Sequence, residues 1–231
     1  MTAIPVVILG AGGHTAELCA YAAALHALGR AKIVGCLDDH AAIDRAGVLN
    51  VLGRLSRLPE LLEMSPGLGV LTGSADNMLR RLLVARAEAV VRGPVPWWTL
   101  LHPTASVGPG VEIGAGTCVA AGSILTTRIQ IGRHCIVNVK TSVSHDTVIG
   151  DFVNLNPGVT IASGVRIGDG SYIGAGATII DKATIGEGAV VGAGTLVLGD
   201  VPANATVVGV PARVIKYHTT SWEPVAVPRR A

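Results

Sequence analysis

The sequence is poor in aromatic and charged residues, which make up only 3% and 15% of its 231 positions. Its apolar residues are spread along the chain. No uninterrupted apolar run of about eighteen residues occurs, so we predict no transmembrane helix and no membrane partner. The formal net charge is only +2. The chain has no basic run with interleaved aromatic residues, and we therefore expect no nucleic-acid partner.

Cysteine is also scarce, and the chain begins without a basic segment. The four cysteines are Cys19, Cys36, Cys118 and Cys135, and their spacing matches no zinc pattern, so we expect no metal site. Reduced, buried cysteines favour a cytoplasmic protein. The opening Met-Thr-Ala-Ile-Pro lacks the basic region of a secretory signal peptide, which supports the same expectation.

The second half of the chain is instead dominated by a six-residue repeat. Counted in sixes from Val107, the first position is aliphatic in all sixteen hexads, and the fifth is small or β-branched. Hexapeptide periodicity is the signature of a parallel β-helix. Three hexads make one triangular coil, so residues eighteen apart stack. The second position is mostly Gly, Ala or Asn, and we expect Gly or Asn near the corners to supply the sharp bends.

The first part of the chain alternates predicted strands with predicted helices. The strands are expected at 5–9, 32–37 and 69–72, and the helices at about 15–28, 55–64 and 76–91. Such alternation implies a small parallel sheet. The fold class is therefore mixed, with a Rossmann-like α/β domain at 1–96, a β-helix at 97–216 and a C-terminal tail at 217–231. The Gly-Pro-Val-Pro segment at 93–96 is predicted to be a stiff linker.

Polar and glycine residues gather where two of the predicted strands end. Gly-Ala-Gly-Gly-His at 10–14 follows the first strand and opens a helix, and Asp38 and Asp39 end the second strand. Ligands bind parallel sheets at this edge, and a helix N-terminus favours a diphosphate. The loop matches a dinucleotide fingerprint only in part, because the third glycine position holds Thr15. We favour a nucleotide-sugar diphosphate, with NAD and a plain tight turn as alternatives.

Three motifs together carry a family resemblance. They are the glycine loop at 10–14, Ser-His-Asp-Thr-Val-Ile-Gly-Asp at 144–151, and the closing Val-Gly-Val-Pro-Ala-Arg at 208–213. Over residues 4–216 the chain resembles the bacterial acyltransferases that modify nucleotide-linked amino sugars or sialic acids. The resemblance implies a left-handed β-helix and a homotrimer with active sites between subunits. It also implies acetyl-CoA as the acyl donor, and a nucleotide-linked amino sugar held by the N-terminal domain.

The resemblance implies that His145 is the catalytic base and Asp146 its partner. An imidazole titrates near neutral pH and can take the proton of an attacking amine. A carboxylate beside the ring fixes its tautomer and orientation. Adjacent residues of a strand point to opposite faces, so a corner must turn Asp146 back toward His145.

The resemblance also implies two sets of binding residues. The substrate set is Gly12, Gly13, His14, Asp38, Asp39 and Asn138, and the CoA set is Asn154, Ser163, Ala175 and Ala193. Asn154 stands where the family often has a second histidine that contacts the acetyl carbonyl, and an amide can donate the same bond. The small residues at 163, 175 and 193 can equally be there only to form tight corners.

These observations predict an acetyl-CoA-dependent N-acetyltransferase acting on the amino group of a nucleotide-linked 4-amino-4,6-dideoxy sugar. An O-acetyltransferase of sialic acid or another sugar is the alternative within the class. A zinc hydratase on the same kind of rod needs three converging histidines, and His102, His134 and His145 have the wrong spacing for that. A non-catalytic scaffold that binds a nucleotide sugar is the alternative from another class.

Overall fold

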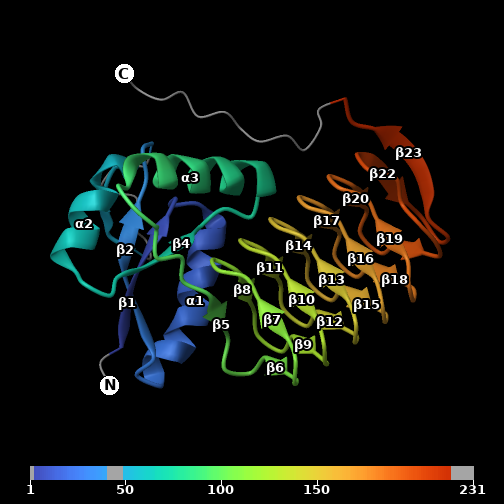
Figure 1. Cartoon of the computed structure of the whole chain (residues 1–231), viewed down its shortest axis with the longest axis horizontal. Coiled ribbons are helices and arrows are strands. Elements are labelled where there is room, and N and C mark those ends of the chain that lie inside the picture. The colour runs from blue at the N-terminus through green and yellow to red at the C-terminus, as the bar shows by residue number, and fades with distance from the viewer. Residues whose placement is uncertain (1–2, 41–48, 220–231) are drawn as a thin grey trace. The chain divides into compact units, whose positions relative to one another are not determined.

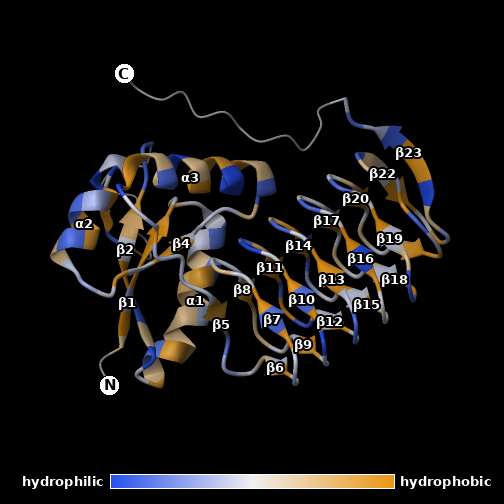
Figure 2. Ribbon diagram, viewed as in Figure 1, coloured by the Kyte–Doolittle hydropathy of each residue, from blue (hydrophilic) through white to orange (hydrophobic). Residues whose placement is uncertain are grey.

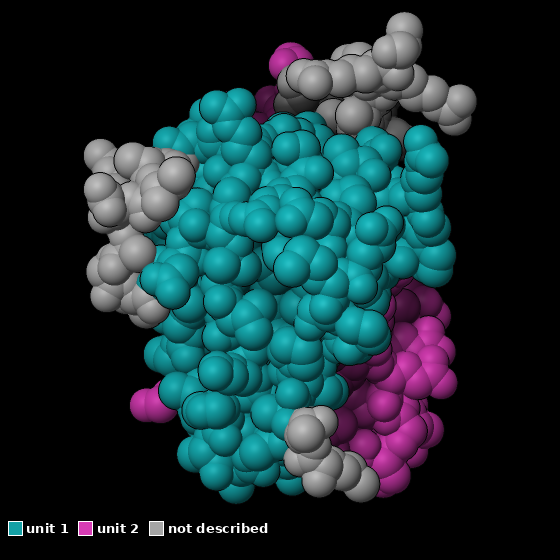
Figure 3. Space-filling model, turned by 90° about the vertical axis from the view of Figure 1, so that its left-hand side faces the viewer, with its two compact units in different colours: residues 1–98, 225–231 teal, residues 99–224 magenta. Residues whose placement is uncertain are grey.

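The computed structural model describes residues 3–40 and 49–219. The chain forms two compact units, the first ending at Trp98 and the second beginning at Thr99 (Figure 3). Residues 220–231, most of the expected C-terminal tail, lie outside the described residues. No helix in the described ranges is both long and apolar enough to cross a membrane.

The first unit is a small α/β domain with a four-stranded parallel sheet in the order β3-β2-β1-β4 (Figure 1). In chain order its elements are β1 (Ile4–Leu9), α1 (Gly13–Ala27), β2 (Ala31–Leu37), β3 (Val51–Gly53), a 3₁₀ turn (Leu55–Arg57), α2 (Leu58–Met64), β4 (Gly69–Thr72) and α3 (Asn77–Val90). All the predicted strands and helices are present, with small shifts at their ends. Strand β3 was not predicted, because it is too short to show a periodic pattern.

Continuous apolar runs explain the sheet of the first unit. Val6, Val7, Ile8 and Leu9 of β1 are all fully buried, as expected for a parallel strand covered on both faces. Figure 2 shows β1, β2 and β4 as hydrophobic throughout much of their length. Helix α3 begins where the carboxylate of Asp76 accepts a hydrogen bond from the Leu79 amide at 2.9 Å, a standard N-cap.

The segment expected to be a linker is hydrogen-bonded along the outer side of β4. The Val70 amide donates to the Pro96 carbonyl at 3.0 Å, and the Trp98 amide donates to the Val70 carbonyl at 2.8 Å. Val70 and Trp97 form a parallel bridge. The first unit therefore holds the chain as far as Trp98.

The second unit consists of short strands stacked in three sheets (Figure 1). The six-stranded sheet contains β6 (Ser106–Val107), β9 (Ile124–Leu125), β12 (Ser142–Val143), β15 (Thr160–Ile161), β18 (Thr178–Ile179) and β21 (Leu196–Val197). The five-stranded sheet contains β7 (Glu112–Ile113), β10 (Gln130–Ile131), β13 (Val148–Ile149), β16 (Arg166–Ile167) and β19 (Thr184–Ile185). The eight-stranded sheet contains β5 (Leu100–Leu101), β8 (Cys118–Val119), β11 (Ile136–Val137), β14 (Asn154–Leu155), β17 (Tyr172–Ile173), β20 (Val190–Val191), β22 (Ala205–Val208) and β23 (Arg213–Tyr217).

The predicted eighteen-residue coil is confirmed, and the second unit is a left-handed parallel β-helix. Ile131 pairs with Ile113 on one side and Ile149 on the other, each eighteen residues away. The aliphatic first positions form one continuous core along the shaft. Several hydroxyls at the fifth position also point inward and donate to carbonyls; Thr117, for example, donates to the Gly132 carbonyl at 2.9 Å. Among the strands of the described residues, only β23 runs antiparallel to its neighbour.

The bends of the rod lie at the fourth position of the hexad, where φ is positive from Gly110 through Gly194. The expectation that asparagine supplies bends was wrong for Asn138 and Asn156, which occupy second positions outside this set. The second-position glycines serve stacking instead. A Cβ at Gly168 would lie 2.5 Å from the Glu187 backbone nitrogen in the next coil. The fourth-position glycines are therefore explained by backbone conformation, and the second-position glycines by the close spacing of the coils.

Candidate active site

His145 and Asp146 form a hydrogen-bonded pair at the corner that follows β12. His145 occupies the third position of its hexad and faces outward, with 52% of its side chain exposed. Asp146 occupies the fourth position and has a φ of 62°, in the left-handed region. This conformation turns the carboxylate back, so that Oδ2 lies 2.6 Å from His145 Nδ1. The contact expected between these adjacent residues is therefore present.

Arg128 is a third member of this cluster and was not predicted. It lies one coil earlier, eighteen residues before Asp146, so the repeat itself carried the signal. Its Nε donates to Asp146 Oδ1 at 2.7 Å and its Nη2 donates to Oδ2 at 3.0 Å. The Arg128 hydrogen bonds, followed by the His145 contact, hold the pKa of Asp146 well below its usual range. Asp146 is therefore ionised at neutral pH.

Ser163, predicted to present its amide to CoA, lies one coil after His145. Its amide donates to Asp181 Oδ1 at 3.0 Å, and its hydroxyl donates to the same oxygen. These two bonds from Ser163 lower the pKa of Asp181. The backbone amide of Ser163, which was expected to contact CoA, is therefore hydrogen-bonded within the rod.

The other predicted rod residues lie along the eight-stranded sheet and the corner after it. Asn138 follows β11, where its Oδ1 accepts a hydrogen bond from the Val139 amide at 2.7 Å. Asn154 begins β14 and is buried, with 3% of its surface exposed. Ala175 and Ala193 follow β17 and β20 and are exposed. A single protomer therefore does not place these residues beside His145.

The three rod histidines belong to different sheets. His102 follows β5 and lies 2.9 Å from the Thr104 hydroxyl through Nδ1. His134 follows β10, is buried, and stacks on Phe152 with 5.1 Å between ring centroids. His145 follows β12. Across residues 3–40 and 49–219, no three His, Cys, Asp or Glu side chains are grouped closely enough to hold a metal ion.

The first unit contains a separate pocket of about 450 Å³ at the carboxyl ends of β1 and β2. The N-terminal residues predicted to bind substrate all line it: Gly12, Gly13, His14, Asp38 and Asp39. Arg86 of α3 also lines the pocket and was not predicted, because nothing in a single helix sequence shows which side chain reaches a neighbouring strand end. These five residues, which follow the ends of predicted strands, therefore lie together in one pocket.

The two aspartates tie the pocket's loops together. Asp38 accepts hydrogen bonds from the Ala11 amide in the glycine loop and from the His40 amide, both at 2.8 Å. Asp39 accepts a bond from the Leu55 amide at 2.9 Å and forms an ion pair with Arg86. Burial opposes the ionisation of Asp39, but the bonds from Leu55 and Arg86 outweigh it and lower its pKa.

The beginning of α1 leaves space in the pocket. Gly12 is the N-cap residue, and no side chain caps the helix there. A Cβ at Gly12 or Gly13 would have no protein atom within 4 Å, so these glycines leave room for a ligand. His14 is buried, and burial lowers its pKa against the opposing hydrogen bond with Glu17. Thr15 donates to the Gly10 carbonyl at 2.8 Å and so fixes the loop.

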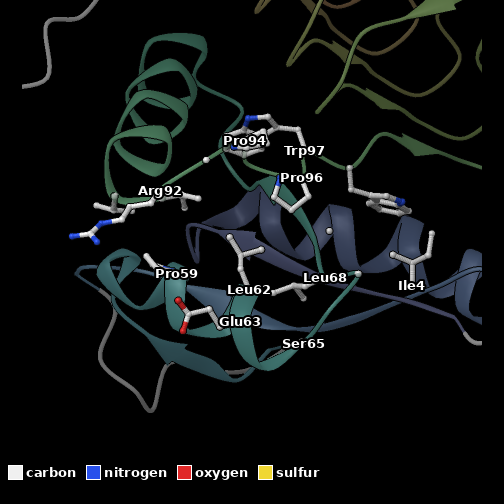
Figure 4. A pocket seen from close by; sticks show the side chains of 16 residues that line it. Ile4, Pro59, Leu62, Glu63, Ser65, Leu68, Arg92, Pro94, Pro96 and Trp97 are labelled. Carbon is white, nitrogen blue, oxygen red and sulfur yellow. The ribbon is translucent and has the colours of Figure 1, made fainter.

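A larger hollow of about 890 Å³ in the first unit has a different character (Figure 4). Pro94, Pro96, Trp97, Leu62 and Leu68 dominate its lining. Figure 4 shows the guanidinium of Arg92 pointing away from these apolar side chains. This hollow brings together no base and acid of the kind found at His145, so we do not place the chemistry there.

Comparison with known proteins gives a consistent result. The family model "Bacterial transferase hexapeptide (six repeats)" matches residues 164–199. A GDP-perosamine N-acetyltransferase from Escherichia coli O157:H7 is 36% identical over 72 residues. That match spans 31% of this chain and only 33% of the relative's length.

Two solved structures match almost the whole chain. The acetyltransferase domain of PglB from Neisseria gonorrhoeae FA1090 is 32% identical with a TM-score of 0.78, over 92% of this chain and 100% of that one. PerB from Caulobacter crescentus, in complex with CoA and GDP-perosamine, is 33% identical with a TM-score of 0.80, over 92% and 97% of the two chains. The fold and the sequence of this chain are therefore similar to those of both solved structures over nearly their whole length. This chain belongs to the bacterial sugar acyltransferases of the hexapeptide-repeat family.

Proposed function

We propose that the protein transfers an acetyl group from acetyl-CoA to the amino group of a nucleotide-linked 4-amino-4,6-dideoxy sugar. The observation that carries the proposal is the exposed His145–Asp146 pair, held at 2.6 Å on a corner of the rod. Support for the substrates comes from the relatives, since the PerB structure contains CoA and GDP-perosamine and the E. coli relative is named for GDP-perosamine.

In this proposal His145 acts as the general base. Because Asp146 is ionised, it accepts a hydrogen bond from His145 Nδ1 and leaves Nε2 without a proton. Nε2 takes the proton from the sugar amine as the nitrogen attacks the thioester carbonyl carbon. The tetrahedral intermediate then expels the CoA thiolate, which regains a proton from the imidazolium. The products are an amide and free CoA.

The pocket of the first unit is proposed to hold the nucleotide diphosphate. Backbone amides at an uncapped helix N-terminus attract anionic groups, and the glycines there leave space for close approach. Asp38 and Asp39 at the neighbouring strand end have acceptor oxygens suited to the N–H and O–H groups of the base or ribose. His14, kept neutral by burial, adds no charge at this position.

A homotrimer is proposed because the candidate residues of one rod are divided between its corners. His145 and Ser163 share the corner after the six-stranded sheet, whereas Ala175 and Ala193 share the corner after the eight-stranded sheet. A neighbouring copy, packed side by side with threefold symmetry, would bring the second corner of one rod against the first corner of another. Each active site would then draw residues from two copies.

We also propose a cytoplasmic location. None of the four cysteines forms a disulfide, and Cys36, Cys118 and Cys135 are buried. Burial raises the pKa of the Cys19 thiol to about 11, and the thiol is therefore unreactive at neutral pH. Cysteines that form no disulfide fit a reducing compartment.

Incubation with acetyl-CoA and a matched acceptor panel tests the proposed function. The panel pairs nucleotide-linked 4-amino sugars with the corresponding 4-hydroxy sugars and with sialic acid. We expect mass spectrometry to find one added acetyl group on the amine acceptors, with release of stoichiometric CoA. Acetylation of the hydroxy acceptors alone would overturn the proposed N-transfer. Binding of the nucleotide sugar without any CoA release would favour a non-catalytic scaffold.

A further inference from the structure

The aspartates of the rod have two different kinds of partner. Asp151, Asp169, Asp181 and Asp200 each accept a hydrogen bond from a backbone amide of the preceding coil. These bonds tie one coil to the next. Asp181 accepts from the Ser163 hydroxyl as well. Asp146 is different, because both of its oxygens accept from ionisable side chains, those of Arg128 and His145. The carboxylate of Asp146 therefore links the side chains of Arg128 and His145.

Arg128 and Asp146 are also held in an unusual backbone conformation. Both lie at the fourth position of their hexads and are not glycine, although φ is 51° at Arg128 and 62° at Asp146. Most corner positions of the rod hold glycine, for which this region costs nothing. The other non-glycine residues at fourth positions with positive φ are His134, Lys140, Phe152 and Lys182. Arg128 and Asp146 differ from these four by meeting in a fork-shaped ion pair. Two parallel N–H···O bonds fix the plane of the carboxylate more firmly than a single point contact does.

We propose that Arg128 is a positioning residue for catalysis, which orients Asp146 and, through it, the imidazole of His145. The proposal rests on the proposed function, in which His145 is the base. Both Asp146 oxygens contact Arg128, and Oδ2 also contacts His145 Nδ1. Without the fork, Asp146 could rotate about its side-chain bonds and release the ring. The cluster is largely exposed, with 64% of the Arg128 side chain and 47% of that of Asp146 accessible, so burial does not hold it in place.

Arg128 also balances the charge next to the base. The ionisable groups in the His145 cluster are Asp146 in its own coil and Arg128 in the coil before. Asp181 lies two coils after His145, where it accepts from Ser163. Lys182 follows it in the same coil. The guanidinium cation and the Asp146 anion offset each other in the fork. Loss of Arg128 leaves the Asp146 anion uncompensated.

The test compares Arg128→Gln and Arg128→Lys with a matched control, Arg166→Gln, at an exposed arginine of β16 in another sheet of the rod. We expect Arg128→Gln to lower kcat on the order of tenfold, with both KM values within about twofold of wild type. Arg128→Lys restores the charge but not the fork, so it should restore only part of kcat.

Two results would overturn the proposal. One is an Arg128→Gln enzyme with wild-type kcat, and the other is complete recovery of kcat by Arg128→Lys. A merely structural ion pair between coils would lower the melting temperature without lowering kcat below the melting transition. Equilibrium binding of CoA to each variant confirms that the site has folded.

A double variant separates this proposal from the proposed function. If Arg128 acts through His145, Arg128→Gln should have little further effect on kcat in a His145→Asn background, because coupled residues are not additive. An undiminished effect in that background would overturn the positioning role. If His145→Asn by itself retained full activity, the proposed general base would be the part that fails.

Discussion

At the scale of single residues, the account assigns the proton transfer to His145. His145→Ala is expected to lower kcat by a factor on the order of 10² to 10⁴, the usual loss for a missing general base. Binding of CoA should change little, because the imidazole is expected to meet the amine. Steady-state kinetics and calorimetry measure the two quantities on the same preparation.

Asp146→Asn is expected to cost less activity than His145→Ala, because the amide still fills the corner but no longer stabilises the correct tautomer. A larger loss from Asp146→Asn than from His145→Ala would contradict the order of roles proposed for this pair.

His14 gives a residue-scale prediction about pH and stability. Burial lowers the pKa of His14 in the folded protein, so below about pH 6.5 the unfolded chain binds a proton that the folded chain does not. Folding stability should therefore fall as pH drops from 7 to 5. His14→Gln is expected to reduce this slope, and urea unfolding at several pH values measures it. An unchanged slope in the variant would show that other groups cause the pH dependence.

At the scale of elements, the rod depends on the absence of a side chain at the second-position glycines. Gly168→Ala would place a Cβ 2.5 Å from the backbone of the next coil, and we expect a loss of about 1–3 kcal/mol in unfolding free energy. Gly199 has open space around its Cβ position and is the matched control. Gly199→Ala should stay within about 0.5 kcal/mol of wild type. Equal losses at the two sites would contradict the stacking argument.

The glycine loop before α1 gives a second element-scale prediction. Gly12→Val puts a branched side chain into space that the protein itself leaves empty, so the fold should be retained. The KM for the nucleotide sugar should rise by at least about tenfold, since the side chain blocks the approach of a diphosphate to the helix amides. An unchanged melting temperature with an unchanged KM would place the nucleotide elsewhere.

The elements differ in how far the sequence predicted them. The sixfold pattern predicted the rod and its register, because each inward residue recurs at a fixed spacing and the core admits only aliphatic side chains. The same register places Arg128 one coil before Asp146. A single arginine in the sequence does not by itself indicate a functional residue. Arg86 could not be predicted, because its meeting with Asp39 depends on how α3 packs on the sheet. The predicted positions of the bends were wrong, because the periodicity shows which positions recur but not which of them have a positive φ.

At the scale of the whole molecule, the account predicts active sites shared between copies. His145→Ala removes the base, and Ala193→Trp is designed to block the expected CoA groove, so each variant alone should be inactive. In a trimer that contains both variants, about one interface in three would combine an intact base with an intact groove. Co-expression of the two variants should therefore restore activity. Absence of any recovery in verified mixed oligomers would indicate sites contained within one copy.

The most direct measurement is single-turnover transfer from labelled acetyl-CoA to a nucleotide-linked 4-amino sugar, with wild type and His145→Asn side by side. The account predicts rapid formation of the N-acetylated sugar by the wild type, and a rate lower by a factor on the order of 10² or more in the variant, at unchanged CoA affinity. Equal rates in the two proteins would contradict the claim that the imidazole at this corner is the base.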